Sequence, residues 1–481
     1  MTRERLTFGH TAHAAVPAQR SVIATAASLA HEPVPVRFSR LETWDWGCGG
    51  LLIFTILLFF RPQDQVRVLG ALHVSDAAAL IGLMAMVLVN TSRREPMIRV
   101  TPELLGMAGF GLVMLVTIPT STWAGGSMRV FTDMFIQVAL IFVLMVNTIT
   151  SPRRVERICW VIVLAFGYIS ARVIFDYMRG MNLVEGNRAS GPVGGFFQNP
   201  NDLALNLAAF LPLALMYVKR PGPAFKRLLC AGISVLMLLA LVFTKSRGGQ
   251  LAAAAMLVTF LLVSRSLTPG TILALVVAGM VTLPMLPQSY IDRMSSIVNE
   301  EKDVTGSREE RRVVMEQAWQ VFLDHPLTGI GAGQFQNFEQ PGSTLTWRQT
   351  HNAPLQVAAE IGIFGVVAFF YLIWRAFKSA WWTRRELSWI FQPRSRKSGQ
   401  ATAPPEDGLE DQERLFLQTH GAAMVAGLAA WFVGAQFGSV AFNWRFYYLL
   451  GLAVTPVGII QARRKAYAKA KALAGRESAA A

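Results

Sequence analysis

Charged residues are scarce in this sequence: they make up 16% of 481 residues, whereas hydrophobic residues make up 53% and the mean hydropathy is +0.39. Because soluble domains carry about 25% charged residues, this shortage excludes a water-soluble multidomain protein. Cysteine is also scarce. Cys48, Cys159 and Cys230 lie within or beside apolar runs and have neither metal-ligand nor disulfide spacing. We therefore expect three small core residues and no disulfide framework.

The sequence is instead rich in apolar runs that are about as long as a bilayer is thick. Short connections rich in Gly, Pro or charge separate them, as expected where each helix satisfies its own backbone hydrogen bonds in lipid. The pattern predicts an all-α fold: a polytopic integral membrane helical bundle with about 12 transmembrane helices. The expected spans are 46–60, 75–90, 102–119, 130–148, 158–176, 202–218, 227–243, 249–263, 269–285, 353–374, 420–437 and 445–461.

The net charge of +15 is distributed as an orientation signal rather than as a nucleic-acid footprint. If the N-terminus is inside, the inner segments hold about twice as many Lys and Arg residues as the outer ones, as the positive-inside rule requires. We therefore expect both termini in the cytoplasm, with membrane lipids and no nucleic acid as partners.

This topology divides the chain into a flexible cytoplasmic tail (1–43), a transmembrane bundle (44–461) and a basic cytoplasmic tail (462–481). Two long loops are expected within the bundle: an outward-facing loop at 286–351, and a cytoplasmic loop at 375–419. The composition of residues 393–413, inside the second loop, is typical of disorder.

The outward-facing loop contains the pattern of a helix near 308–324. Ser307 and Glu310 have the spacing of a capping box, apolar residues then recur at helical intervals, and Pro326 ends the pattern. We expect this helix to lie on the outer surface of the bundle.

Three arginines share one face at the start of that helix. Arg308, Arg311 and Arg312 are spaced i, i+3 and i+4, beside the positive end of the helix dipole. Like charges placed there repel one another unless an anion is present. The alternative for any one arginine is a surface helix whose arginines meet lipid phosphates or the neighbouring glutamates. Binding of a ligand phosphate by at least one of them is the favoured interpretation.

The stretch "NLVEGNRASGPVGGFFQNPNDLAL" supplies a second outer element. Asn199, Asn201 and Asp202 are suited to capping the helix that follows, and capping is the favoured role for Asn201 and Asp202. Arg188 lies in an expected flexible loop near Glu185. It fits either a paired surface residue or a mobile anion clamp, and the sequence does not separate the two.

The turn "TKSRGGQ" (244–250) is expected on the outer side, yet it contains two cations, Lys245 and Arg247, which the positive-inside rule would place in a cytoplasmic loop. Lys245 is expected to extend toward lipid phosphate. Arg247 precedes Gly248 and Gly249, which would let a bulky group approach the backbone, and a guanidinium matches phosphate with two parallel hydrogen bonds. An anion site is the favoured interpretation for Arg247.

The fourth outer element joins "GIGAGQF" to "RQTHNAPLQVAAEIGIFG". The glycines at 329, 331 and 333 follow no strand, so a tight turn explains them better than a dinucleotide site. Asn352 and Pro354 are placed to begin the next helix, which leaves His351 just outside its N-terminus. The helix dipole there disfavours the protonated imidazole, so His351 is suited to accept a proton; a merely structural hydrogen-bonding role is the alternative that the sequence leaves open.

Arginines and one candidate base at the outer end of a bundle suit a ligand with one end in the bilayer and an anionic centre at its surface. A polyprenyl-diphosphate sugar has this form, because cations would stabilise the departing diphosphate while a base takes the acceptor's proton. The outer segments contain no DxD motif or dense carboxylate cluster. We therefore expect no metal site and no cofactor, with arginines in place of Mg²⁺.

Four motifs then carry a family resemblance: "NPNDLAL", "TKSRGG", "SREERRVVMEQAWQVFLDHPLTGIGAGQF" and "HNAPLQVAAEIGIFG". In this order, over about residues 185–370, the chain resembles the O-antigen ligase and polymerase superfamily, which uses undecaprenyl-diphosphate-linked glycans in the bacterial periplasm. The resemblance implies a GT-C-like bundle in the inner membrane. It also implies that Arg247 and an arginine at 308–312 bind diphosphate, and that His351 activates the acceptor.

Within the superfamily the acceptor remains open. Ligation of O-antigen to lipid A core is slightly favoured, whereas polymerisation of repeat units and protein O-oligosaccharyl transfer need the same chemistry. The alternative from another class is a lipid-linked glycan flippase. A flippase would require ionisable residues deep within the spans, and the sequence has few of them.

Overall fold

The computed structural model describes residues 45–65, 74–185, 187–192, 194, 197–282, 288–295, 307–338, 349–388 and 408–480. Apart from turns and loops, these residues are helical except for one short hairpin, in which β1 (Leu183–Val184) pairs antiparallel with β2 (Arg188–Ala189). The expected tail at 1–43 and most of the expected disordered segment at 393–413 lie outside the described residues.

The helices largely follow the expected spans, with longer ends. In chain order they are α2 (Trp46–Phe59), α3 (Pro62–Gln65), α5 (Val74–Ser92), α6 (Pro102–Thr117), η2 (Ile118–Thr120), α7 (Ala124–Arg129), η3 (Val130–Ile136), α8 (Gln137–Thr148), α9 (Pro152–Met178), α10 (Pro200–Lys219), α11 (Ala224–Phe243), α12 (Arg247–Val263), α13 (Pro269–Thr282), α14 (Gln288–Ser295), α15 (Ser307–Asp324), η7 (Phe335–Asn337), α16 (Ala353–Glu386), α17 (Asp411–Ala435) and α18 (Trp444–Ala480).

Within the described residues, eight helical segments are long and apolar enough to cross a membrane. They are Val74–Ser92, Pro102–Thr120, Ala124–Thr148, Pro152–Met178, Pro200–Lys219, Ala224–Phe243, Ala353–Glu386 and Asp411–Ala435. This bears out the polytopic helical class. The total of about twelve spans stays a prediction, because α2 and α12 are shorter apolar helices and α13 has only 14 residues.

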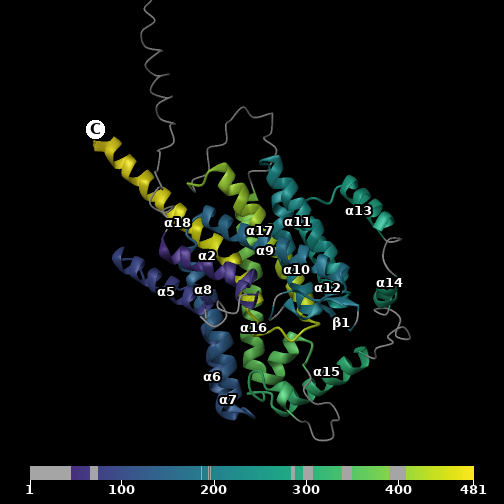
Figure 1. Cartoon of the computed structure of the whole chain (residues 1–481). Coiled ribbons are helices and arrows are strands. Elements are labelled where there is room, and N and C mark those ends of the chain that lie inside the picture. The colour runs from purple at the N-terminus through teal and green to yellow at the C-terminus, as the bar shows by residue number, and fades with distance from the viewer. Residues whose placement is uncertain are drawn as a thin grey trace, which may run out of the picture.

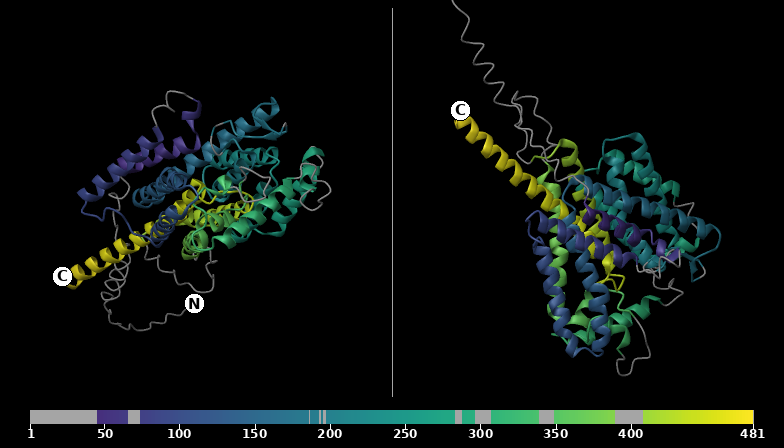
Figure 2. Two further views of the ribbon diagram at one scale, coloured as in Figure 1. Left: turned by 90° about the horizontal axis from the view of Figure 1, so that it is seen from below. Right: turned by 60° about the vertical axis from the view of Figure 1, so that its left-hand side comes forward.

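Helices α10 and α17 form the centre of the bundle. In their most apolar windows 78% and 72% of the residues are buried, against 22% in the peripheral α5. Helix α10 packs against α17, and α12 and α16 also pack against α17 (Figure 1). The C-terminal part of α18 projects beyond this bundle (Figure 2).

Many helices begin with a polar cap followed by proline. The cap side chain accepts a hydrogen bond from a first-turn amide that has no partner within the helix, and proline has no amide to satisfy. Residues that act in this way are Thr101, Ser151, Asn199 and Asn352. The predicted start of the helix after His351 is therefore confirmed.

Helix α16 is broken at Gly362, whose φ of 70° and ψ of −169° are not helical. A break inside an apolar helix frees carbonyl groups that must find other donors. The preceding loop supplies them: the Ile330 amide donates to Ala359 O at 3.0 Å, and the Gly331 amide to Glu360 O at 2.8 Å. The glycine-rich turn is therefore a docking segment for α16, and α15 packs against α16 beside it (Figure 1).

We predict that Gly362→Ala destabilises the protein. The backbone conformation is one that only glycine adopts readily, at a cost of about 1–3 kcal/mol for other residues. In addition, a Cβ at this position would lie 2.4 Å from Leu327 O. The unfolding temperature in detergent should fall clearly. Gly109→Ala is the control, because a Cβ there has no neighbour within 4 Å; equal stability of the two variants would contradict the assignment.

Candidate functional site

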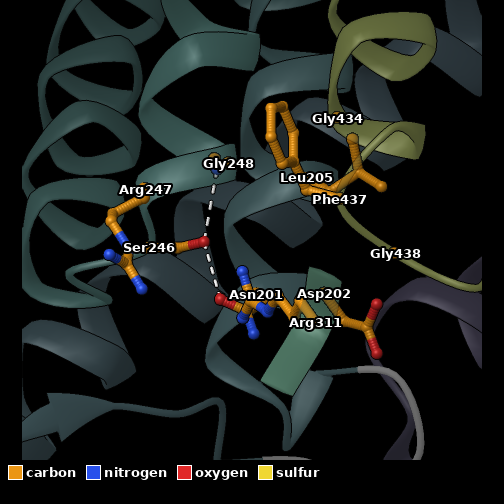
Figure 3. Close-up of a pocket in the computed structure, with 11 residues that line it drawn as sticks. Asn201, Asp202, Leu205, Ser246, Arg247, Gly248, Arg311, Gly434, Phe437 and Gly438 are labelled. Carbon is orange, nitrogen blue, oxygen red and sulfur yellow. Dashed lines mark hydrogen bonds between the residues drawn. The ribbon is translucent and has the colours of Figure 1, made fainter. Parts of the chain in front are cut away.

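The turn between α11 and α12 is held by hydrogen bonds on both sides. Ser246 caps α12 by accepting from the Gly249 amide at 3.2 Å, and its hydroxyl donates to Asn201 Oδ1 at 2.8 Å (Figure 3). Arg247 is thereby fixed as the first residue of α12, next to the start of α10. The expected extension of Lys245 toward lipid is wrong, because this residue is only 4% exposed and lies within the protein.

Gly248 and Gly249 serve helix packing rather than access for a bulky group. A Cβ on Gly248 would lie 2.7 Å from Phe437 Cβ, and one on Gly249 would lie 2.3 Å from Ala204 Cβ. The two glycines therefore let the start of α12 approach α10 and the end of α17. As a result, the backbone of Arg247 lies where these three helices meet.

Arg188 is a buried crosslink in this structure. Its side chain is 4% exposed; Nε donates to Thr244 O at 3.1 Å, and Nη2 donates to Asn201 Oδ1 at 2.7 Å. Nη1 pairs with Glu185 at 3.2 Å. The side chain is paired, as in one of the two roles that the sequence left open, but it is buried rather than on the surface. A role for Arg188 in diphosphate binding stays a prediction. These contacts tie the β1–β2 hairpin to the turn that carries Arg247.

The capping role expected for Asn201 and Asp202 is wrong. Asn199 caps α10 by accepting from the Asn201 amide at 2.8 Å, which leaves the other two side chains to cross between helices. The Asp202 carboxylate accepts from Arg445 Nη1 at 2.9 Å, and Arg445 is 1% exposed. Sequence reasoning missed this pair, because the two partners are far apart in the chain and each alone fits a local role.

Helix α15 confirms the helix expected near 308–324. Arg311 is partly buried, whereas Arg312 is exposed and pairs with Glu316 one turn later at 3.0 Å. The side chains of Ser307 and Arg308 lie outside the described residues, and so does the expected capping box. On the side of α15 turned away from Arg312, Val314, Ala318 and Val321 pack against the docking loop and α16.

Four of the expected site residues line one cavity of about 780 Å³: Arg247, Arg311, Arg312 and His351. They come from three segments that are far apart in the chain. Their cavity falls within the size range of small-molecule sites, about 300–1,000 Å³. Most of the remaining wall is apolar and comprises Leu251, Met315, Trp319, Leu355 and Phe437. A smaller hollow of about 20 Å³ adjoins it between Arg247, Arg311 and the start of α10 (Figure 3).

His351 is fixed at the cavity by the turn after α17. Its amide donates to Ser439 Oγ at 3.0 Å, and the Thr350 hydroxyl contacts the same oxygen at 2.7 Å. Asn352 adds a hydrogen bond to Gln436 Oε1 at 3.3 Å. The backbone of His351 has a φ of 51°, a left-handed conformation that these contacts maintain. Sequence reasoning did not single out Gln436 or Ser439, since neither has a distinctive local pattern.

Glu360 couples the arginine-bearing helix to the helix that follows His351. Its carboxylate is buried and accepts from the amides of Gly333, at 2.8 Å, and Phe335, at 3.4 Å. A buried carboxylate is costly unless such donors surround it. The loop after α15 is therefore held to α16 both by the Glu360 side chain and by backbone hydrogen bonds. Because of these bonds, α15 cannot move independently of His351 without breaking them.

Among the described residues, no group of three or more His, Cys, Asp or Glu side chains is arranged to hold a metal ion. The cavity instead gathers guanidinium groups, which bind phosphate oxygens through fixed, paired donors. Metal independence of any reaction at this cavity stays a prediction.

The described helices and cavity define a polytopic helical membrane protein with a basic, largely apolar-walled site between α15, the starts of α12 and α16, and the turn after α17. Residues 232–370 match the family model described as O-antigen ligase, which confirms the resemblance to the O-antigen ligase-like superfamily. The matched segment includes Arg247, Arg311, Arg312 and His351, whereas Arg188, Asn201 and Arg445 lie outside it. No curated protein matched the chain significantly.

We predict that Arg188→Ala and Arg312→Ala differ in their effect on stability. Removing Arg188 leaves the buried Thr244 carbonyl without its side-chain donor and takes away one of the two donors to Asn201 Oδ1. This loss should cost about 1–3 kcal/mol, whereas Arg312 is exposed. Thermal unfolding in detergent should show a lower midpoint for Arg188→Ala only. Similar midpoints for both variants would mean that the Arg188 contacts are not structural.

Proposed function

We propose that the protein is a membrane glycosyltransferase that moves a glycan from undecaprenyl diphosphate to an acceptor hydroxyl, most simply the hydroxyl of a lipid A core. The observation that carries the proposal is the cavity shared by Arg247, Arg311, Arg312 and His351. The family match supports the reaction class, since it covers all four residues. The site would face the periplasm of a bacterial inner membrane, with both termini in the cytoplasm.

The arginines suit the diphosphate of such a donor. Arg247 and Arg311 line both the large cavity and the adjoining hollow, so two guanidinium groups from different helices flank the same space. Each offers parallel N–H donors to phosphate oxygens. Because negative charge on the diphosphate rises as the glycosidic bond breaks, these donors stabilise the transition state more than the ground state.

The apolar wall suits the polyprenyl chain. Leu251 on α12 and Leu355 on α16 line the cavity beside Met315 and Trp319 of α15. A prenyl chain that extends from the diphosphate along this wall is removed from water. Its burial would stabilise the bound donor by about 25 cal/mol for each Å² of apolar surface. One cavity therefore accommodates both ends of an amphipathic donor.

His351 is the proposed general base. The acceptor oxygen forms a bond to the anomeric carbon of the glycan, and the bond from that carbon to the diphosphate oxygen breaks with its electron pair leaving on undecaprenyl diphosphate. The acceptor's proton passes to the imidazole of His351. The backbone of His351 is held in place by two hydrogen bonds to the 436–439 turn, one from the His351 amide and one from the Asn352 side chain. General bases of this type contribute about 10²–10⁴-fold in rate.

The test of this proposal is transfer by purified protein from an undecaprenyl-diphosphate glycan to three separate acceptors: lipid A core, a second lipid-linked repeat unit, and a Ser-containing peptide. We expect product with lipid A core, and an unchanged rate in the presence of chelator. Product with only the second or third acceptor would identify a polymerase or a protein oligosaccharyltransferase. Movement of the donor across liposomes without transfer to any acceptor would identify a flippase.

We predict that Arg247→Ala and His351→Ala both abolish most transfer but differ in donor binding. Loss of one transition-state donor costs about 10²–10³-fold in rate, and loss of the base about 10²–10⁴-fold. Arg247→Ala should also weaken binding of the lipid diphosphate, whereas His351→Ala should leave it nearly unchanged. Binding and single-turnover rates measured separately make this distinction.

Arg179→Ala is the matched control for these variants. Arg179 follows α9, and its guanidinium lies 4.2 Å from the Phe175 ring, outside the cavity. It should transfer at the rate of the unaltered protein. Full activity of either site variant, or equal loss in the control, would remove the basis for the assignment.

A further inference from the structure

A second basic cavity lies at the opposite ends of the helices that build the first. It has a volume of about 380 Å³ and is lined by Lys219 and Arg220 at the end of α10, by Arg265 after α12, and by Arg384 near the end of α16. Helix α12 begins at Arg247 and ends at Val263, so its 17 residues separate the two cavities by about 25 Å. The second cavity is therefore a distinct site.

Capping of helix C-termini explains part of this cluster. Arg384 Nε donates to Val263 O at 2.7 Å, and Lys219 Nζ donates to Ser264 O at 3.3 Å. Cations are stabilised near helix C-termini, each of which carries about half a negative charge. One carboxylate, Glu156, also pairs with Arg220 at 3.1 Å.

These negative charges do not balance the four cations. The ends of α10, α12 and α16 supply about half a charge each and Glu156 supplies one, which leaves a positive surplus. Arg265 and Arg384 lie close enough for their charges to repel each other. Within the described residues, no carboxylate lies within ion-pair distance of either one. The surplus positive charge therefore favours binding of an anion in the cavity.

An exposed tryptophan indicates that the cavity lies at the depth of lipid headgroups. Arg384 lies over the ring of Trp381 at 5.0 Å, and this ring is 46% exposed, whereas Arg220 lies over the buried ring of Phe416 at 5.1 Å. Exposed tryptophan side chains are enriched at the membrane interface, where one part of the ring meets hydrocarbon and the other meets water. Apolar residues of α10 and α12 that precede these cations in the chain line the rest of this wall: Met216, Phe260 and Val263. The occupant therefore needs an anionic head and an apolar tail.

We propose that this cavity binds an anionic phospholipid, with its phosphate among Lys219, Arg220, Arg265 and Arg384 and an acyl chain against Met216 and Phe260. The positive-inside distribution places this end of the bundle at the cytoplasmic leaflet. Basic pockets between transmembrane helices on that side bind anionic headgroups. The proposal does not depend on the glycan-transfer function of the other cavity.

The test measures binding of phosphatidylglycerol and phosphatidylcholine to the purified full-length protein by native mass spectrometry in detergent. We expect preferential binding of phosphatidylglycerol, which Arg265→Gln combined with Arg384→Gln weakens by roughly tenfold to thirtyfold. The control pair, Arg93→Gln with Arg94→Gln, removes two exposed cations outside the cavity and should bind as the unaltered protein does. The single Arg265→Gln variant should weaken binding about fivefold and serves if the double variant does not fold.

Four results would overturn the proposal. One is equal binding of the two lipids, and another is equal loss in the control pair. The third is displacement of bound phosphatidylglycerol by inorganic phosphate at millimolar concentration, because a site for free phosphate gains nothing from an acyl chain. Retained binding in both Arg265→Gln variants would likewise show that the lipid sits elsewhere.

Discussion

The geometry of the candidate site depends on one constraint: carbonyl groups freed inside an apolar helix must be paired. The break at Gly362 exposes the carbonyls of Ala359 and Glu360, and the loop after α15 pairs with both. Water cannot perform this task reliably within an apolar bundle, so the loop is obligatory. Because the loop continues directly from α15, pairing the broken helix also places Arg311 beside the start of α12. Backbone hydrogen bonding by the loop thus sets the position of a guanidinium about twenty residues earlier in the chain.

The arginines at the outer end of the bundle fall into two physical classes. Arg188 and Arg445 are almost fully buried and bond to partners on other elements, so each joins segments that would otherwise separate. Arg247, Arg311 and Arg312 instead line the open cavity. Buried charges are retained only where hydrogen bonds offset their desolvation, whereas the cavity-lining guanidinium groups border a space that a ligand can enter. The first class makes the second class rigid, and rigidity is what electrostatic stabilisation of a transition state requires.

The sequence predicted the elements of the fold better than the contacts between them. Apolar length and polar caps, such as Asn352 before α16, are local signals, so the helices appeared close to their expected positions. The convergence of Arg247, Arg311, Arg312 and His351 was also predicted, from charge placed against the orientation rule and from the family resemblance. The assignments that failed were those in which a side chain with a plausible local role has its partner on a distant element. Asn201 and Asp202 look like helix caps until Arg188, Ser246 and Arg445 are brought beside them.

Gly248 and Gly249 illustrate why such partners are invisible in a single sequence. Paired glycines beside an arginine fit a ligand-approach loop as well as a close helix contact, and only the position of Phe437 and Ala204 decides between them. Their packing role has a functional consequence. By letting α12 approach both α10 and α17, they bring the first residue of α12 into contact range of the 436–439 turn that also holds His351. The same close packing that stabilises the bundle therefore places the candidate anion-binding arginine and the candidate base in one cavity, without any residue being dedicated to that purpose alone.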